Sequence, residues 1–183
     1  MDAELVRRAQ RGDKDAYDAL ARISANRMYA VAHRILGHAD RAEDALQQAL
    51  INVWTELPKL RDPGRFEAWT YRLVVRSSLA EARRYRSVAV MELDNLDASM
   101  SAPDDAAGLV TRDRLSRAFG QLSPEHRAVV VLHHYLGFSL PEIADALQIP
   151  YGTVGSRLHT ATHRLRTVLG EPDPDLATGG QPA

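Results

Sequence analysis

The chain has 183 residues, of which 45% are hydrophobic, and its formal net charge is −1. This length suits one domain or two small ones, and the absence of cysteine excludes disulfides, thiol nucleophiles and cysteine-bound metals. Because the net charge is close to zero, any attraction to nucleic acid must come from a local basic surface.

Helical periodicity dominates the sequence, and no segment shows the convincing alternating pattern of a strand, so we predict an all-α fold. The first two helices are expected over residues 3–10 and 14–36. Asp13 is a residue type that starts helices, and Gly37 is the type that most often ends them.

A third helix is predicted from Asp40 to about Leu57, because Asp40–Glu43 resembles a capping box. Helical spacing gives this helix an apolar stripe that we expect to be buried. The stripe consists of Leu46, Ala49, Leu50, Val53, Trp54 and Leu57. The polar residues expected to point outward are Glu43, Asp44, Gln47, Gln48 and Asn52.

A long helix follows from Arg65, and its later part is basic. One side of this helix carries Phe66, Trp69, Leu73, Ser77 and Ala80. From Arg61 to Ser87 the chain carries seven arginines and three carboxylates, interleaved with aromatic residues that could stack on unpaired bases. This composition favours a polyanion-binding surface, and the alternative is an ordinary solvated helix face.

The composition changes after this basic helix. From residue 88 to residue 113, six carboxylates stand against one arginine. We therefore predict two small helical domains, at residues 1–87 and 111–170, joined by a flexible acidic linker at residues 88–110. Residues 171–183 have the composition of a disordered tail.

The second domain is predicted to be helical throughout. Ser123 can cap a helix, and the run Val129–Leu132 is assigned to a buried helix. Ser139–Glu142 has a capping-box pattern that starts a further helix. A short break at Ile149–Gly152 separates that helix from a last one, which ends near Gly170.

The last predicted helix has an apolar stripe on one side and a basic face on the other. The stripe consists of Val154, Leu158, Ala161, Leu165 and Val168. The opposite face carries hydroxyls and basic side chains suited to phosphate oxygens and base edges, namely Thr153, Ser156, Arg157, Thr160, His163 and Arg164. The segment from Tyr151 to Leu169 contains no carboxylate. Together with the capped helix and short break before it, this pattern favours a DNA-binding helix-turn-helix over a merely solvated amphipathic helix.

Three segments resemble the extracytoplasmic-function (ECF) group of bacterial RNA polymerase sigma factors, in the family's order and spacing. They are AEDALQQALINVWTELP from Ala42, FEAWTYRLVVRSSLAEARRYR from Phe66, and LSPEHRAVVVLHHYLGFSLPEIADALQIPYGTVGSRL from Leu122. The resemblance implies a sigma factor that binds core RNA polymerase and directs promoter-specific transcription initiation. Its first domain would grip the polymerase and open the −10 element, and its second would read the −35 element.

The resemblance also implies roles for individual residues. Polymerase binding falls on Glu43, Asp44, Gln47 and Gln48. Contacts with the −10 element fall on Tyr71, Arg72, Arg76, Arg83, Arg84, Tyr85 and Arg86. The −35 helix runs from Gly152 through Leu165 and includes the six polar residues named above. The chain departs from the family pattern at Arg76, Gly155, Thr160 and Thr162. These departures affect which promoter sequence is expected more than they affect the expected function.

The implied partners are core polymerase, promoter DNA and an inhibitory anti-sigma factor. The amino terminus lacks the apolar run of a signal peptide, and no segment is long and apolar enough to span a bilayer. We therefore expect a cytoplasmic protein without membrane insertion.

Two other classes of function fit parts of the sequence. His159 and His163 are four residues apart, a spacing that can bind a metal, but neither a third ligand nor an HExxH pattern accompanies them. We therefore expect no metal, cofactor or catalytic residue. The nearer alternative is a helix-turn-helix transcriptional regulator with a helical sensing or dimerisation domain. The basic, aromatic helix of the first domain favours a protein that bridges DNA and polymerase.

Overall fold

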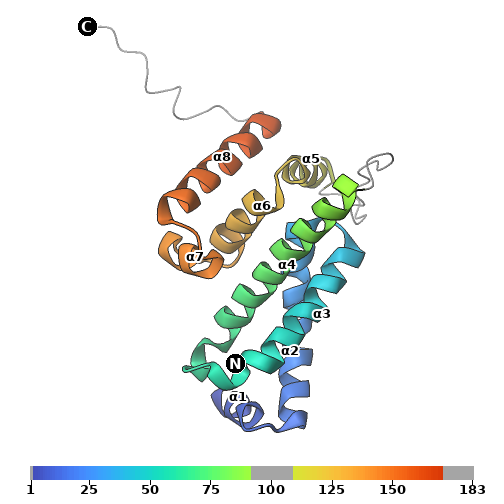
Figure 1. Ribbon diagram of the computed structural model, residues 1–183. Coiled ribbons are helices and arrows are strands. Elements are labelled where there is room, and N and C mark those ends of the chain that lie inside the picture. Colours follow the sequence, from blue (N-terminus) through green and yellow to red (C-terminus); the bar gives the residue numbers. More distant parts are fainter. Residues whose placement is uncertain (1, 92–108, 171–183) are drawn as a thin grey trace, which may run out of the picture. The chain divides into compact units, whose positions relative to one another are not determined.

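The computed structural model describes residues 2–91 and 109–170, with side chains for residues 2–87 and 115–170. Every regular element in these ranges is helical, which confirms the predicted all-α fold (Figure 1). Within the same ranges, no helix is long and apolar enough to cross a membrane.

The chain divides into two compact units, Met1–Ala98 and Ser99–Ala183, which agrees with the prediction of two helical domains. Helix α4 continues to Met91 and helix α5 begins at Leu109, so both helices extend into the range predicted as a linker. The rest of that predicted linker and the predicted tail lie outside the described residues.

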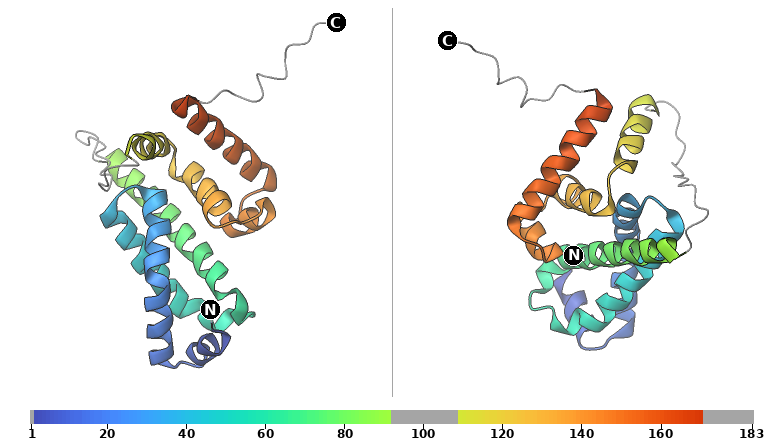
Figure 2. Two further views of the ribbon diagram at one scale, coloured as in Figure 1. Left: turned by 180° about the vertical axis from the view of Figure 1, so that it is seen from behind. Right: turned by 45° about the horizontal axis from the view of Figure 1, so that its top comes forward.

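In its described residues, 2–91, the first unit has three long helices and a short amino-terminal one. Its elements are α1 (Ala3–Gln10), α2 (Lys14–Leu36), α3 (Ala39–Glu56), the 3₁₀ turns η1 (Leu57–Lys59) and η2 (Pro63–Arg65), and α4 (Phe66–Met91). Helices α2, α3 and α4 pack against one another, as Figures 1 and 2 show from several sides. The buried apolar side chains include Leu20, Met28, Ile35, Phe66 and Val74. Burial of one such side chain contributes about 1.5–3 kcal/mol, so the core rather than helix propensity holds the unit together.

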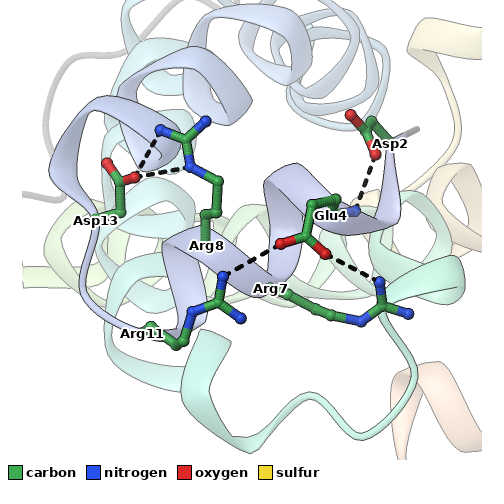
Figure 3. A network of polar contacts seen from close by, with 6 residues as sticks. All are labelled: Asp2, Glu4, Arg7, Arg8, Arg11 and Asp13. Carbon is green, nitrogen blue, oxygen red and sulfur yellow. Dashed lines mark hydrogen bonds and ion pairs between the residues drawn. The ribbon is translucent and has the colours of Figure 1, made fainter.

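Helices α1 and α2 begin and end at the predicted residues, because their ends are satisfied locally. The carboxylate of Asp13 accepts a hydrogen bond from the Ala16 amide at 3.0 Å. Gly37 ends α2 with a φ of 75°, in the left-handed region that favours glycine. Figure 3 shows the ion pairs around α1, which join Arg8 to Asp13 and Glu4 to Arg7 and Arg11. These pairs are exposed and therefore add little to stability.

The start of α3 corrects the sequence prediction. The helix begins at Ala39 with His38 as its N-cap, and no side-chain hydrogen bond caps it. The Ala42 amide already donates to the His38 carbonyl at 3.0 Å, so Asp40 lies in the first turn rather than at the cap. A carboxylate in this position still interacts favourably with the helix dipole.

The predicted apolar stripe of α3 and the predicted side of α4 are only partly buried. Ala49 and Val53 are buried, whereas Trp54 is 41% exposed and contacts Tyr17 edge-on, with ring centroids 4.7 Å apart. On α4, Leu73 and Ser77 are buried and Ala80 is exposed, although all three lie along the predicted side. The predicted burial of Trp54 was wrong because the apolar stripe of a helix is wider than its contact with a neighbour, so residues at the edge of the stripe meet solvent.

Over residues 109–170, which are the part of it that is described, the second unit packs four α-helices around a smaller core. Its elements are α5 (Leu109–Gly120), α6 (Pro124–Val130), the π-helical segment η3 (Val131–Tyr135), α7 (Leu140–Leu147) and α8 (Tyr151–Leu169). Leu122, Val130 and Ala161 form a buried cluster, against which Phe119, Leu158 and Leu165 pack. Ser123 caps α6 as predicted, and its hydroxyl accepts from the His126 amide at 3.4 Å.

The run Val129–Leu132 is helical and buried, as predicted, but its geometry changes within the run. From Val131 the helix is π-helical, and the Leu136 amide donates to the Val131 carbonyl, five residues earlier, at 3.0 Å. This widened turn leads into Gly137, whose φ of 73° reverses the chain before α7.

Candidate nucleic-acid interface

The second unit contains the predicted helix-turn-helix, formed by α7, a short turn and α8. Helix α7 starts with the predicted capping box, in which Glu142 accepts from the Ser139 amide at 2.9 Å. The turn differs from the prediction: Gln148 takes the left-handed conformation with a φ of 54°, and Gly152 lies within α8. Pro150 is the N-cap of α8, which begins at Tyr151. The change of chain direction therefore lies before the proline, at Gln148.

Helix α8 buries one side and exposes the other. Val154 and Ala161 are fully buried, whereas Val168, predicted in the same stripe, is 39% exposed because it lies beyond Leu165, the last residue of α8 that packs on the core cluster. Among the six predicted −35 residues, Ser156, His163 and Arg164 are exposed, and Thr153, Arg157 and Thr160 are half-buried. All six therefore reach the surface of the unit.

The exposed face of α8 also includes His159, which is not among the six predicted −35 residues. Gly152, Ser156, His159 and His163 are all exposed and recur at spacings of four, three and four, along one line of the helix. Tyr151, the first residue of α8, is 58% exposed. The spacing of His159 from the two predicted residues beside it was the signal that could have added it to the set.

The pKa of a histidine on α6, His126, is affected by the positive charge of this face. Burial lowers the pKa of His126 below its ordinary value, and the charges of Arg164 and Arg157 lower it further. Its ring Nδ1 lies 2.8 Å from the hydroxyl of Ser123, so the ring is held at the start of α6. Since α8 itself carries no carboxylate, its face presents the positive charge that phosphate binding requires.

A second basic surface lies along α4 in the first unit. Arg72, Arg76, Arg83 and Arg86 recur at spacings of four, seven and three, which places them on one side of the helix. Arg83 and Arg86 are exposed, and Arg72 and Arg76 are half-buried. One side of α4 can therefore follow a chain of phosphates.

The two tyrosines predicted for the −10 site differ in their surroundings. Tyr71 is half-buried and its hydroxyl donates to Glu67 at 3.0 Å. Burial, together with this carboxylate, raises the pKa of Tyr71. Tyr85 is 39% exposed, and the guanidinium carbon of Arg41 lies 4.2 Å from its ring centroid. Tyr85 is the more accessible of the two for contact with a base.

Arg84 was predicted together with the other arginines of α4, but its side chain is turned toward α3. Its Nε donates to Glu81 at 2.8 Å, and its Nη2 donates to Asp44 on α3 at 3.3 Å. The structure thus joins a predicted −10 residue to a predicted polymerase-binding residue.

The predicted polymerase-binding residues lie together on one exposed face of α3. They are Glu43, Asp44, Gln47 and Gln48, and all four are exposed. Asn52, predicted to point outward, is half-buried and donates to the Ser77 hydroxyl of α4 at 3.3 Å. Beside this face, α3 and α4 border a groove lined by Asp44, Ala45, Gln47, Gln48, Ile51, Ser77, Ala80, Glu81 and Arg84. Ile51 is 51% exposed and gives the groove an apolar wall.

Among the described residues, the two histidines of α8 belong to no group that could hold a metal ion. In the part of the chain that the structure describes, no group of three or more His, Cys, Asp or Glu residues could hold a metal ion. Protein zinc sites generally need at least three protein ligands. His159 and His163 are therefore assigned to the exposed face of the helix-turn-helix.

The chain matches two family models, Sigma-70 region 2 over residues 20–88 and Sigma-70, region 4 over residues 112–165. It is 35% identical over 148 residues to the ECF RNA polymerase sigma factor SigL of Mycobacterium tuberculosis, across 79% of this chain and 83% of the relative. The chain belongs to the ECF sigma factors. In this sigma factor, the region 2 match contains α3 and most of α4, and the region 4 match contains α7 and most of α8.

The sigma factor is similar to further relatives over most of its length. The ECF RNA polymerase sigma factor SigW of Bacillus subtilis is 27% identical to it, across 90% of this chain and 94% of the relative. The structure of the sigma factor RpoE in complex with the anti-sigma factor NepR from Bartonella quintana has the same fold, with a TM-score of 0.68 and 22% identity, across 84% of this chain and 96% of RpoE.

The family confirms the function predicted from the sequence. As a sigma factor, the protein binds core RNA polymerase and directs promoter-specific transcription initiation. The alternative of a helix-turn-helix regulator with a sensing domain is not favoured, because the region 2 match covers the first unit from residue 20 to the end of its basic helix.

Proposed function

We propose that this sigma factor divides promoter recognition between its two units, with α8 reading the −35 element and α4 contacting the −10 element. The observation that carries this proposal is the exposed, carboxylate-free face of α8 on a helix-turn-helix. A helix of this kind fits the major groove of B-DNA, where hydroxyls and guanidiniums pair with base edges.

Within α8, Arg157 is the residue proposed to read a base. It lies in the second turn, and the early residues of a docked recognition helix come nearest to the bases. Its guanidinium can pair with a guanine through two hydrogen bonds. Further contacts to bases and phosphates are proposed for Thr153, Ser156, Thr160, His163 and Arg164.

On α4, the arginines are proposed to bind the DNA backbone near the −10 element. This role falls on Arg72, Arg76, Arg83 and Arg86, which share one side of the helix. Tyr85 is exposed and is proposed to stack on an unpaired base, a contact that tolerates any sequence. Tyr71 is half-buried and is proposed to support the same surface.

The face of α3 formed by Glu43, Asp44, Gln47 and Gln48 is proposed to bind core polymerase. The protein then acts by binding rather than by catalysis, and it works in the cytoplasm, where polymerase meets promoter DNA. An inhibitory anti-sigma factor is a further proposed partner, because the similar RpoE is held in a complex with the anti-sigma factor NepR.

The test is transcription from purified components. The protein is added to core polymerase with a promoter library randomised at the −35 and −10 elements, and the transcripts are sequenced. A sigma factor with these two sites yields transcripts from templates enriched at both elements. A regulator with a sensing domain would bind duplex DNA by itself and yield no specific transcript with core polymerase alone.

The polymerase face has a prediction of its own. Replacing Asp44, Gln47 and Gln48 together with Ala should weaken core polymerase binding by at least about tenfold, or 1.4 kcal/mol, because interface contacts are lost. Exposed substitutions usually change stability by less than about 0.5 kcal/mol, so the circular dichroism spectrum should not change.

The matched control for this triple variant is Asp18→Ala with Asn26→Ala, which removes exposed polar side chains from α2. The control should bind core polymerase as the wild type does. Unfolding of the triple variant would show that the three residues are structural, and an unchanged affinity would remove them from the polymerase surface.

A further inference from the structure

Arg84 is held between two carboxylates at the edge of the α3–α4 groove. Its Nε donates to Glu81 at 2.8 Å, one turn earlier on α4, and its Nη2 donates to Asp44 across the groove at 3.3 Å. The Glu81 side chain is only 12% exposed, so it provides a fixed anchor for the guanidinium. The pKa of Arg84 is raised first by Glu81 and then by Asp44.

The other exposed arginines near the end of α4 point elsewhere. Successive residues of a helix are about 100° apart, so Arg83 and Arg84 face different directions although they are neighbours in the sequence. Arg83 belongs to the side that carries Arg76 and Arg86, whereas Arg84 lines the groove beside Asp44. A DNA strand bound along Arg76, Arg83 and Arg86 would not reach Arg84, which would stay paired with Glu81 and Asp44.

We propose that Arg84 is a positioning residue of the polymerase-binding face, which holds the Asp44 carboxylate at the edge of the α3–α4 groove, and that it is not a ligand of promoter DNA. The proposal rests on the proposed role of the α3 face. The partner is core polymerase. The polymerase segment that fits this surface carries a cation that pairs with Asp44 and an apolar side chain that packs on Ile51, which is 51% exposed.

The contribution of Arg84 follows from the exposure of Asp44. The Asp44 side chain is 57% exposed, so without Arg84 it would move between rotamers and would lose this freedom when polymerase binds. Fixing one such side chain on binding lowers the affinity by a factor of up to about ten. The Arg84–Asp44 pair is itself exposed and holds the carboxylate only weakly, so Arg84 removes part of this cost before polymerase arrives.

The experiment compares Arg84→Ala with the matched neighbour Arg83→Ala in the full chain. Two quantities are measured, the dissociation constant for core polymerase and the salt dependence of promoter binding by the assembled holoenzyme. Arg84→Ala should weaken core binding about 2–10-fold and leave the salt slope unchanged. Arg83→Ala should show the reverse, with unchanged core binding and a slope reduced by about 0.9 per duplex phosphate, or about 0.7 for a single strand.

The positioning role is tested by repeating Arg84→Ala in an Asp44→Ala background. With Asp44 absent, the loss of Arg84 should have no further effect on core binding, since Arg84 acts through that carboxylate. An effect that persists would mean that Arg84 contacts polymerase directly, and a reduced salt slope would make it a DNA ligand. Either result overturns the proposal, as does unchanged or tighter core binding. Failure of the wild-type protein to bind core polymerase would instead contradict the proposed function.

Discussion

Gly155 lies in the second turn of α8, where an added β-carbon would meet no heavy atom within 4 Å. Glycine inside a helix is about 0.5–1 kcal/mol less favourable than alanine, because it loses more backbone freedom on folding. We therefore predict that Gly155→Ala raises the free energy of unfolding of the second unit by about this amount. Thermal unfolding followed by far-ultraviolet circular dichroism, which senses the helices of both units, measures the effect.

The chain contains its own control for this measurement. Both tryptophans, Trp54 and Trp69, lie in the first unit, so tryptophan fluorescence reports the unfolding of that unit alone. The fluorescence transition should stay where it is while the circular dichroism transition moves upward. A downward shift for Gly155→Ala would mean that the bare backbone at this position is needed within the unit itself.

The exposure of a side chain was predictable from the sequence where it depends only on the periodicity of its own helix. The exposure of Glu43 and Gln47 follows from the helical period of α3 alone, and the structure agrees with it. The position of Arg84 depends on Asp44, forty residues earlier on another helix, and no local pattern predicts that pairing. Asn52 was misplaced for the same reason, since its partner is Ser77 on α4.

Among the connecting elements, the turn of the helix-turn-helix carries backbone strain. Gln148 is the only residue other than glycine with a positive φ in the described parts of the chain. Side chains with a β-carbon are strained by about 1–2 kcal/mol in this conformation, whereas glycine adopts it freely. We predict that Gln148→Gly raises the free energy of unfolding by about 0.5–1 kcal/mol, because strain relief exceeds the added freedom of the unfolded chain.

Gln148→Ala is the matched variant for this turn, since it removes the same side chain but keeps the β-carbon. It should give no comparable gain in a urea titration. Equal stabilisation by both variants would locate the effect in the glutamine side chain rather than in the backbone. A loss of stability with Gln148→Gly would mean that contacts of that side chain outweigh the strain.

Helix ends were predictable where a local signal decides them. Gly37 and Gly170 end α2 and α8 in the left-handed conformation that glycine favours, and Ser139 starts α7 through its capping box. The start of α3 was missed because His38 caps it through the backbone alone. The π-helical segment after Val130 also has no local signal in the sequence.

The whole molecule consists of two units with separate cores, and each unit carries one of the proposed DNA contacts. The sequence predicted this division because its composition changes from basic to acidic after the long helix of the first unit. The boundaries were less predictable, since α4 and α5 extend into the acidic range from both sides. At these two ends of the range the chain is helical, where composition alone suggested a linker.

Separate cores predict that the two DNA contacts contribute independently to promoter binding. Arg83→Ala, in the first unit, should weaken the binding of all promoters alike and reduce the salt slope by about 0.9 per duplex phosphate. Arg157→Ala, in the second unit, should cost about 1–3 kcal/mol and relax the preference at one position of the −35 element.

In the double variant, the two losses of promoter binding free energy should add within about 0.3–0.5 kcal/mol, because the substitutions lie in different compact units. The measurement is the affinity of each holoenzyme for one promoter and for a library randomised at the −35 element, at several salt concentrations. Arg22→Ala, an exposed arginine on α2, is the control for the loss of one positive charge. A double variant that loses at least 1 kcal/mol less than the sum would show that the units are coupled when both are on the promoter. An unchanged base preference with Arg157→Ala would reassign that arginine from a base to a phosphate.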